Sequence, residues 1–488
     1  MRARGLLVAG VIGVAAFLTT IDGTIVNVAL PSIQRDLGMS LPQLQWAVTG
    51  YLLTFAALML TGGRLADRYG ARPVLLAGLA LFTGASLPAG LAPGAAVLLA
   101  ARAAQGAGAA LVLPAGLAVV AAGRTARQRD AGAAVWMAAL AAALATGPVA
   151  GGWLAQHLGW HWIFLVNIPA GLAGMALGWL GLPSGDAAHG AAGPHGAAGP
   201  HGAARLPGAA GPLGLPSLAC CTVLLGGVTY ALIEGPGQGF GSPAVIAAVV
   251  LACAAAAGLR RAERRAPAPM IDIGLVRQRA LGGSLAASVL WGAGVNGVLF
   301  YTSLFLQRAA GFSATRTGLV FAPLAVLVVL VTPATPYLTG RFGAARTVAA
   351  GLAAVAAGLA AIAMVRHQVT VPRLLPGLAL IGTGSALTVP LTSAALAAVP
   401  ANRTGVAGGL IAVAREASGL AGIAVLGLLV TAGHPVPPHG RLGTGFVNGY
   451  GAGLLTAAAL AAVAAVIAAR TLPGPDRAVQ VPVNAPAR

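Results

Sequence analysis

The sequence contains no lysine and very few acidic residues. All 29 basic side chains are arginine, only 10 residues are Asp or Glu, and charged residues make up 8% of the 488-residue chain. Soluble domains carry about 25% charged residues, so this chain has too little polar surface to face water on all sides. The composition therefore excludes a soluble enzyme and a nucleic-acid-binding domain, despite the formal net charge of +19.

The absence of lysine also excludes a nucleotide-binding phosphate loop, because the G-x-x-x-x-G-K-[ST] pattern requires one. We therefore expect neither ATP hydrolysis nor a cofactor, and an ion gradient is the available source of energy. The three cysteines, Cys220, Cys221 and Cys253, lie in apolar runs and lack the spacing of metal ligands. They are interpreted as small, buried hydrophobic side chains.

Long apolar runs dominate the chain, which is 58% hydrophobic with a mean hydropathy of +0.86. A helix needs about 20 apolar residues to cross a bilayer, whereas a β-barrel strand shows about 10 alternating ones. The unbroken runs predict an all-α polytopic membrane protein with fourteen transmembrane helices. The predicted spans are 6–30, 43–62, 73–91, 96–121, 131–155, 162–182, 215–233, 243–260, 281–306, 315–335, 346–365, 373–398, 404–431 and 449–470.

The distribution of arginine predicts the orientation of these spans. With the N-terminus inside, 21 of the 29 arginines fall in inside segments, and Arg102 and Arg415 lie within spans. The six in outside loops are Arg35, Arg308, Arg316, Arg366, Arg373 and Arg441. The positive-inside rule therefore places both termini in the cytoplasm. The first apolar run lacks a convincing cleavage site and is interpreted as a span rather than a signal peptide.

Residues 183–214 interrupt the apolar pattern with a Gly/Pro-rich segment. A His-Gly-Ala-Ala-Gly-Pro repeat begins at His189 and His195, and its first four residues recur at His201. Such low complexity is typical of a flexible tether. A metal site on the three histidines is the weaker alternative, because no rigid frame would fix its geometry.

A weak internal repeat indicates two related halves. Arg68-Tyr69-Gly70-Ala71-Arg72 and Arg341-Phe342-Gly343-Ala344-Ala345-Arg346 each precede an apolar run, and the two are eight spans apart. Two homologous six-helix halves with two helices between them would give this offset, and duplicated halves are typical of transporters. The predicted organisation is an N-terminal six-helix bundle (1–182), a cytoplasmic linker (183–214), two additional helices (215–260), a basic cytoplasmic loop (261–280), a C-terminal six-helix bundle (281–470) and a cytoplasmic tail (471–488).

The first copy of the repeat belongs to a turn between the second and third spans. One carboxylate stands there among three arginines, and the residues of interest are Gly63, Asp67, Arg68, Gly70 and Arg72. Such a cluster can latch helix ends through charge-assisted hydrogen bonds, and a latch that holds in one conformation biases a two-state equilibrium. The alternative is a positive-inside loop with an incidental aspartate.

This turn resembles motif A of the major facilitator superfamily, and three other segments extend the resemblance. Residues 21–31 look like the first-helix signature of the fourteen-span drug:proton antiporters of the EmrB/QacA type. The span-4 residues Arg102, Gln105, Gly106 and Gly108 are similar to motif B. The span-5 residues Gly147, Pro148, Gly151 and Gly152 are similar to antiporter motif C. The resemblance covers nearly the whole chain except the linker and the tail.

The resemblance implies a fold of two six-helix bundles plus two central helices. It also implies proton-coupled export of drugs, antibiotics or similar amphipathic molecules across the bacterial cytoplasmic membrane by alternating access. The expected partners are a small-molecule substrate, protons and the lipid bilayer, with no obligatory protein partner. The alternatives are a carrier for an endogenous metabolite or lipid on the same scaffold, and a non-transporting membrane sensor.

Asp22 and Arg102 are the main candidates for proton coupling. Helix rise places Asp22 about 12 Å and Arg102 about 9 Å inside the same membrane face, so they can meet if spans 1 and 4 are neighbours, as the family fold implies. Burial disfavours a charged carboxylate and a nearby arginine favours it, so such a group can load and release a proton. A permanent structural ion pair is the alternative.

Glu416 is a secondary coupling candidate, about 16 Å into span 13. Its neighbour Arg415 is interpreted as structural or gating. Adjacent helical side chains point about 100° apart and do not face each other, so we expect each of the two to need another partner or a wet cavity.

Motif C has a mechanical interpretation. Gly147, Gly151 and Gly152 let helices approach closely, and Pro148 bends the helix. We expect this segment to form a pivot or seal between the two halves.

The candidate residues for a substrate cavity are Asp22, Asn27, Trp291, Asn296 and Tyr301. Trp291 has an aromatic face that can stack on a planar or cationic ligand. Packing or interfacial anchoring explains Trp291, Asn296 and Tyr301 at least as well.

Overall fold

The structure is a computed structural model that describes residues 2–123, 125–183, 215–265, 273–400, 403–431 and 442–473. Within these ranges all regular structure is helical. The α-helices are α1 (Arg2–Leu37), α2 (Leu41–Tyr69), α3 (Ala71–Gly90), α4 (Ala95–Ala121), α5 (Ala126–His157), α6 (Trp162–Leu165), α7 (Asn167–Gly181), α9 (Leu215–Gln238), α10 (Pro243–Arg265), α11 (Ile273–Val276), α12 (Arg279–Leu304), α13 (Ala314–Val331), α14 (Thr335–Phe342), α15 (Ala344–Met364), α16 (Val371–Ala386), α17 (Pro390–Ala397), α18 (Thr404–Thr431) and α19 (Thr444–Thr471). A π-helix, η1 (Phe305–Ala309), continues α12, and a 3-10 turn, η2 (Thr332–Ala334), joins α13 to α14.

These helices form fourteen segments long and apolar enough to cross a membrane, which confirms the predicted number. Each predicted span overlaps one of them, and several helices extend further than the apolar run. The second helix, for example, continues to Tyr69, well beyond its predicted end at residue 62. The linker after residue 183, part of the basic loop and most of the C-terminal tail lie outside the described residues. The domain boundaries there, and the histidine repeat, stay predictions.

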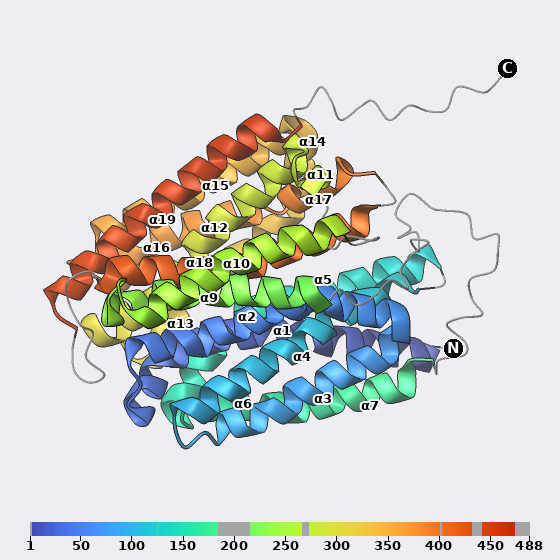
Figure 1. Cartoon of the computed structure of the whole chain (residues 1–488), viewed down its shortest axis with the longest axis horizontal. Helices are drawn as coiled ribbons and strands as arrows, with labels where there is room; N and C mark the ends of the chain where they lie inside the picture. The colour runs from blue at the N-terminus through green and yellow to red at the C-terminus, as the bar shows by residue number, and fades with distance from the viewer. Residues whose placement is uncertain are drawn as a thin grey trace.

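The helices form two bundles with a helix pair between them (Figure 1). Helices α1 to α7 make the first bundle and α12 to α19 the second. The bundles meet along two seams, where α5 packs on α13 and α2 packs on α18. The pair α9 and α10 lies over the second seam, because α9 contacts both α2 and α18 while α10 packs mainly on α9.

Two glycine turns show the internal repeat in three dimensions. Gly70 alone joins α2 to α3 at φ +92°, and Gly343 alone joins α14 to α15 at φ +82°. Glycine adopts this region without the steric cost that other residues meet. In both turns the glycine N–H donates to the carbonyl four residues earlier. The matching geometry explains why the same short sequence occurs in both halves.

Polar side chains fix where several helices begin. Ser40 accepts a hydrogen bond from the N–H of Gln43, whose side chain accepts one from the N–H of Ser40, so the pair forms a capping box. Thr125 starts α5 and Ser313 starts α13 through the same kind of acceptor. These caps satisfy N–H groups that have no partner inside the helix.

The cysteines are free, but their expected burial is wrong. Cys220 and Cys221 are half-buried on α9, and Cys253 is exposed on α10. The reason is the peripheral position of the α9–α10 pair, whose outer face is not covered by other helices. In the described part of the chain, no group of three or more His, Cys, Asp or Glu side chains is placed to hold a metal ion.

Candidate functional site

A buried ion pair lies at the centre of the first bundle. Nη1 of Arg102 on α4 is 2.6 Å from Oδ2 of Asp22 on α1. The two side chains are 1% and 0% exposed. The prediction that they meet is therefore confirmed, because α1 and α4 are in contact and both residues face the same interior point.

Arg102 is held in place by further hydrogen bonds. Its Nε donates to the carbonyl oxygen of Ala47 at 2.9 Å, and its Nη1 also donates to Oε1 of Gln105 at 2.9 Å. Nε2 of Gln105 in turn donates to Oγ of Ser86 on α3 at 2.8 Å. The Ser86 hydroxyl donates to the carbonyl oxygen of Phe82 on the same helix. The network joins α1, α2, α3 and α4, so the position of the guanidinium depends on four helices.

Aromatic rings cover the guanidinium. The Cζ atom of Arg102 lies 4.5 Å from the centre of the Tyr51 ring and 5.7 Å from that of Phe164. Such contacts stabilise a cation away from water. The hydroxyl of Tyr51 donates to the carbonyl oxygen of Thr19 on α1.

One carboxylate oxygen of this site has no hydrogen-bond partner. Oδ1 of Asp22 is fully buried, and none of the described residues donates to it. A buried carboxylate oxygen without a hydrogen-bond partner is energetically costly. The Asp22 carboxylate is thus paired with Arg102 through one oxygen and lacks a donor at the other, while Arg102 is anchored by further contacts.

Tight glycine contacts position the helices of this network. A Cβ at Gly106 would lie 2.2 Å from the carbonyl oxygen of Tyr51, and one at Gly108 would lie 2.7 Å from the backbone nitrogen of Phe82. Both positions therefore require glycine for α4 to approach α2 and α3. These motif B residues act on the ion pair indirectly, because they set the depth of α4 against its neighbours.

The motif C glycines let α5 pack closely on α1 and on α13. A Cβ at Gly147 or Gly151 would collide with α1, at Thr24 or Ile25. A Cβ at Gly152 would lie 2.4 Å from the carbonyl oxygen of Ala314 on α13. The predicted close approach is confirmed, whereas the role of the segment as a pivot or seal stays a prediction.

The other half of this contact comes from α13. A Cβ at Gly318 would lie 2.2 Å from the carbonyl oxygen of Pro148. The two bundles thus meet here backbone to backbone, with glycine on each side.

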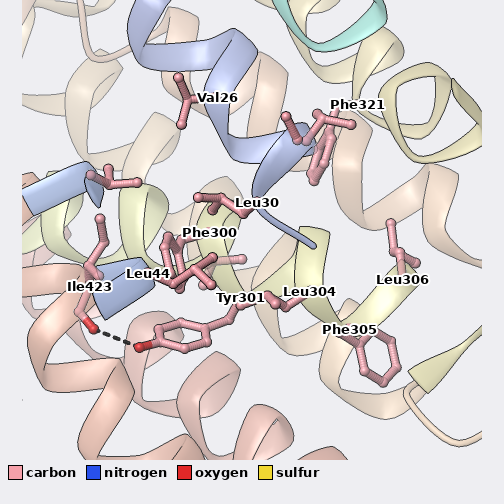
Figure 2. Packing of buried hydrophobic residues seen from close by; sticks show 14 of the residues in the cluster. Val26, Leu30, Leu44, Phe300, Tyr301, Leu304, Phe305, Leu306, Phe321 and Ile423 are labelled. Carbon is pink, nitrogen blue, oxygen red and sulfur yellow. Dashed lines mark hydrogen bonds between the residues drawn. The ribbon is translucent and has the colours of Figure 1, made fainter. Parts of the chain in front are cut away.

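Several hydrogen bonds join the two bundles at one end of the molecule, and we call this set the interbundle seal. Nε2 of Gln45 donates to the hydroxyl of Tyr301, which donates to the carbonyl oxygen of Ile423 at 3.0 Å. Figure 2 shows the bond from Tyr301 to Ile423 among apolar side chains of both bundles, such as Leu44 and Phe300. This polar contact is therefore shielded from solvent.

The remaining bonds of the seal lie at the same end. Gln307 donates to the carbonyl oxygen of Val28 at 2.8 Å, and Arg308 donates to Oε1 of Gln34 at 2.5 Å. The Thr315 backbone N–H donates to Oε1 of Gln156, and its hydroxyl donates to the carbonyl oxygen of Gly152. The seal consists of Gln34, Gln45, Gln156, Tyr301, Gln307, Arg308 and Thr315 with their backbone partners.

Glu416 lies apart from Asp22, on α18, with its side chain 15% exposed. The expectation that Arg415 and Glu416 do not interact is wrong, because Nε of Arg415 reaches to 3.6 Å from Oε1 of Glu416. Long side chains can bend towards each other even from adjacent positions. The helix that carries Glu416, α18, packs on α2 of the first bundle.

The motif A residues lie mainly on helices rather than in a loop. Asp67 and Arg68 belong to the last turn of α2, and Gly63 lies about one turn earlier. Arg72 in the first turn of α3 donates to the carbonyl oxygen of Trp179 at 2.9 Å, which ties α3 to the end of α7. Latching between conformations stays a prediction for this segment.

The five cavity candidates occupy different environments. Asp22 and Tyr301 are fully buried, so a bound molecule would not reach them in this conformation. Asn27 and Trp291 are half-buried and Asn296 is exposed. Both asparagine side chains donate to carbonyl groups of their own helices. A shared cavity for the five residues stays a prediction.

Sequence reasoning missed Tyr51, Ser86 and most residues of the seal. A signal was present for some of them, because glutamine inside an apolar span, as at Gln45, needs a buried partner. No signal in one sequence shows that Gln45 meets Tyr301, which is 256 residues away.

Comparisons with known proteins show which sequences this chain is similar to. The sequence model described as Major Facilitator Superfamily matches residues 12–423. Multidrug resistance protein Stp of Mycobacterium tuberculosis is 35% identical over 422 residues, covering 86% of this chain and 75% of the relative. Puromycin resistance protein pur8 of Streptomyces alboniger is 33% identical over 475 residues, covering 94% and 89%. Tetracenomycin C resistance and export protein of Streptomyces glaucescens is 30% identical over 420 residues, covering 86% and 74%.

Solved structures share the fold at low identity. An auto-inhibited peptide transporter of the POT family superimposes with a TM-score of 0.63 at 16% identity, covering 95% of both chains. The POT family transporter PepTSo gives a TM-score of 0.64 at 16% identity, covering 95% of this chain and 97% of the other. Similarity at this level establishes the arrangement of helices.

Proposed function

This chain belongs to the Major Facilitator Superfamily, and from that premise we propose that it exports amphipathic small molecules such as drugs or antibiotics in exchange for protons. The protein is a multi-pass membrane transporter rather than an enzyme. Export is supported by the resistance proteins to which nearly the whole chain is similar. Proton coupling rests on one observation, the buried Asp22 carboxylate that is paired through one oxygen and open at the other.

The proposed orientation in the bacterial cytoplasmic membrane follows from the arginine bias. With both termini in the cytoplasm, the interbundle seal lies at the outer face. The described conformation is then closed towards the outside, and export requires the seal to open. We assign the motif A segment, with Asp67 and Arg72, to the cytoplasmic face, where it would latch the opposite conformation.

In the proposed cycle, a proton binds Oδ1 of Asp22 and cancels its charge. The Arg102 guanidinium then loses its counter-ion but keeps its bonds to Ala47 and Gln105. A positive charge left without compensation favours a rearrangement of α1 against α4, since buried charges need a partner. Release of the proton on the other side restores the pair. Glu416 is a second group that protonation can neutralise at the seam between the bundles.

The membrane potential can supply enough energy for the proposed export. A membrane potential of about 150 mV supplies about 3.5 kcal/mol per proton, at ~2.3 kcal/mol per 100 mV. That energy supports a gradient of roughly 300-fold for a neutral solute. No nucleotide or other cofactor is therefore needed.

The test is energised efflux of a panel of dyes and antibiotics from a pump-deficient bacterial host. We expect the wild type to give efflux that an uncoupler abolishes, and Asp22→Asn to lose it. Asp36→Asn is the matched control, because Asp36 lies on the same helix but is exposed. Membrane levels of each variant are measured in parallel.

Two outcomes would contradict the proposal. Uncoupler-sensitive efflux that persists in Asp22→Asn would remove Asp22 from coupling. No efflux of any compound, from protein shown to be in the membrane, would favour the carrier of an endogenous metabolite or lipid, which an untargeted comparison of exported molecules would then identify.

A further inference from the structure

A shallow apolar groove runs along the outer surface of the first bundle between α3 and α7. These two helices lie side by side, and the end of α7 lies near the start of α1 (Figure 1). The groove has a volume of about 640 Å³. Its lining is entirely apolar and includes Leu76, Ala77 and Ala80 on α3 and Met175, Ala176 and Trp179 on α7.

Alanines and larger apolar side chains from both helices line the groove. Ala77 and Ala80 on α3 face Ala176 on α7, so the helix surfaces are hollowed there. Trp179 and Leu180 are 69% and 68% exposed at the end of the groove. A tryptophan in such a position is typical of the boundary between lipid tails and headgroups.

Two arginines converge on this end of the groove. Arg72 donates to the carbonyl oxygen of Trp179 at 2.9 Å, and its Cζ lies 5.1 Å from the centre of the Trp179 ring. Arg4, from the start of α1, donates through Nε to the carbonyl oxygen of Gly181 at 3.1 Å. The last carbonyls of a helix attract cations, which explains why both guanidiniums collect at the C-terminal turn of α7.

We propose that the groove between α3 and α7, together with Arg4 and Arg72, binds one anionic phospholipid. An acyl chain lies in the apolar groove, and the phosphate lies at the guanidiniums. Each guanidinium carries five N–H donors in a planar fork that suits phosphate oxygens. This site goes beyond the proposed export function and needs only that the protein resides in a membrane.

Charge complementarity distinguishes this groove from ordinary lipid contact. A second apolar groove, of about 470 Å³, lies between α3 and α4. It is lined by residues such as Gly84, Pro88 and Ala100. Neither lining contains a charged side chain, but Arg4 and Arg72 bond to the end of α7 beside the first groove. We therefore expect this second groove to contact lipid tails without selecting a headgroup, which makes it an internal control.

The experiment is native mass spectrometry of the purified full-length protein in detergent. Phosphatidylglycerol and phosphatidylcholine with identical acyl chains are titrated, so only the headgroup differs. We expect phosphatidylglycerol to be retained preferentially. Arg4→Gln should weaken its binding about fivefold, which corresponds to ~1 kcal/mol for one arginine near the headgroups.

Groove-filling variants test the tail. Ala176→Phe occupies the α3–α7 groove and should weaken phosphatidylglycerol binding at least as much as Arg4→Gln. Ala100→Phe fills the second groove and should leave the headgroup preference unchanged. Both alanines are exposed on the helix surface, so neither change disturbs the bundle interior. If Ala176→Phe is not monodisperse, Ala77→Leu fills the same groove.

The proposal is wrong if the two lipids are retained equally. It is also wrong if filling the α3–α7 groove leaves phosphatidylglycerol binding unchanged, or if Ala100→Phe weakens it as much as Ala176→Phe. Binding lost in Arg4→Gln but not in the groove variants would reduce the site to a headgroup contact and overturn the role of the groove. None of these outcomes depends on efflux activity.

Discussion

Replacing Gly427 with alanine should weaken the interbundle seal without unfolding either bundle. A Cβ at this position of α18 would lie 2.2 Å from Nε2 of Gln45 and 2.6 Å from the hydroxyl of Tyr301. The amide is the end of a flexible side chain, so it can move away, and its bond to Tyr301 is then lost. The expected result is a protein that folds but opens more easily at the sealed end.

The size of the effect follows from the buried hydrogen bond. A typical bond contributes ~0.5–1.5 kcal/mol net, and a buried polar group left without a partner costs ~1–3 kcal/mol. The population of the closed conformation relative to the open one should therefore fall about 5-fold to 100-fold. Tyr301→Phe removes the same bond from the other side. The double variant should thus cost less than the sum of the two single variants.

The assay is a distance distribution by pulsed electron spin resonance in a cysteine-free background. Labels at Ala96 in the first bundle and Gln368 in the second report the separation at the sealed end, and both positions are exposed. We expect Gly427→Ala to add a population at longer distance. Gly408→Ala, on the same helix as Gly427, is the matched control, because the nearest atom to its Cβ would be Cδ2 of Leu396 at 4.0 Å. An unchanged distribution in Gly427→Ala would refute the assignment of Gln45 and Tyr301 to the seal.

Three further predictions concern stability and packing. Arg102→Ala should lower the folded yield and the melting temperature in detergent, because removing one partner of a buried ion pair costs ~3–5 kcal/mol; Asp22→Asn added to Arg102→Ala should recover part of this loss, and no recovery would contradict the pairing. Gly70→Ala and Gly343→Ala should each lower the free energy of unfolding by ~1–2 kcal/mol, because both positions have positive φ. The melting temperature in detergent should fall by similar amounts in the two variants. Gly84→Ala, whose Cβ would meet open space, should not lower it. Trp46→Phe removes the indole N–H that donates to Glu234 at 3.1 Å, so it should increase hydrogen exchange in α9. Trp153→Phe on the exposed side of α5 should not change this exchange. Equal exchange in the two variants would show that the bond does not anchor α9.

The number of helices and the central ion pair were predictable because each depends on a simple physical quantity. A bilayer sets the length of an apolar run, so the fourteen spans follow from counting. The rise per residue placed Asp22 and Arg102 at similar depth, and charge made each the natural partner of the other. The family resemblance supplied the remaining step, that spans 1 and 4 are neighbours.

The seal was not predictable in the same way. Its members are mostly neutral, glutamines with a threonine and a tyrosine, and such side chains have no unique partner by charge. Their pairing depends on how two bundles meet, and Gln307 finds the carbonyl oxygen of Val28 only through that docking. Helix geometry alone also did not predict that the adjacent side chains of Arg415 and Glu416 would bend into contact.

The position of α9 and α10 makes the two seams unequal. The α2–α18 seam is covered by α9, while among the described residues no comparable helix lies over the α5–α13 seam. A lipophilic molecule that diffuses within the bilayer therefore meets one shielded flank and one uncovered flank. The flank without a covering helix is the one that direct glycine contacts between α5 and α13 hold closed, so the two flanks are closed in different ways although the bundles are related by a repeat.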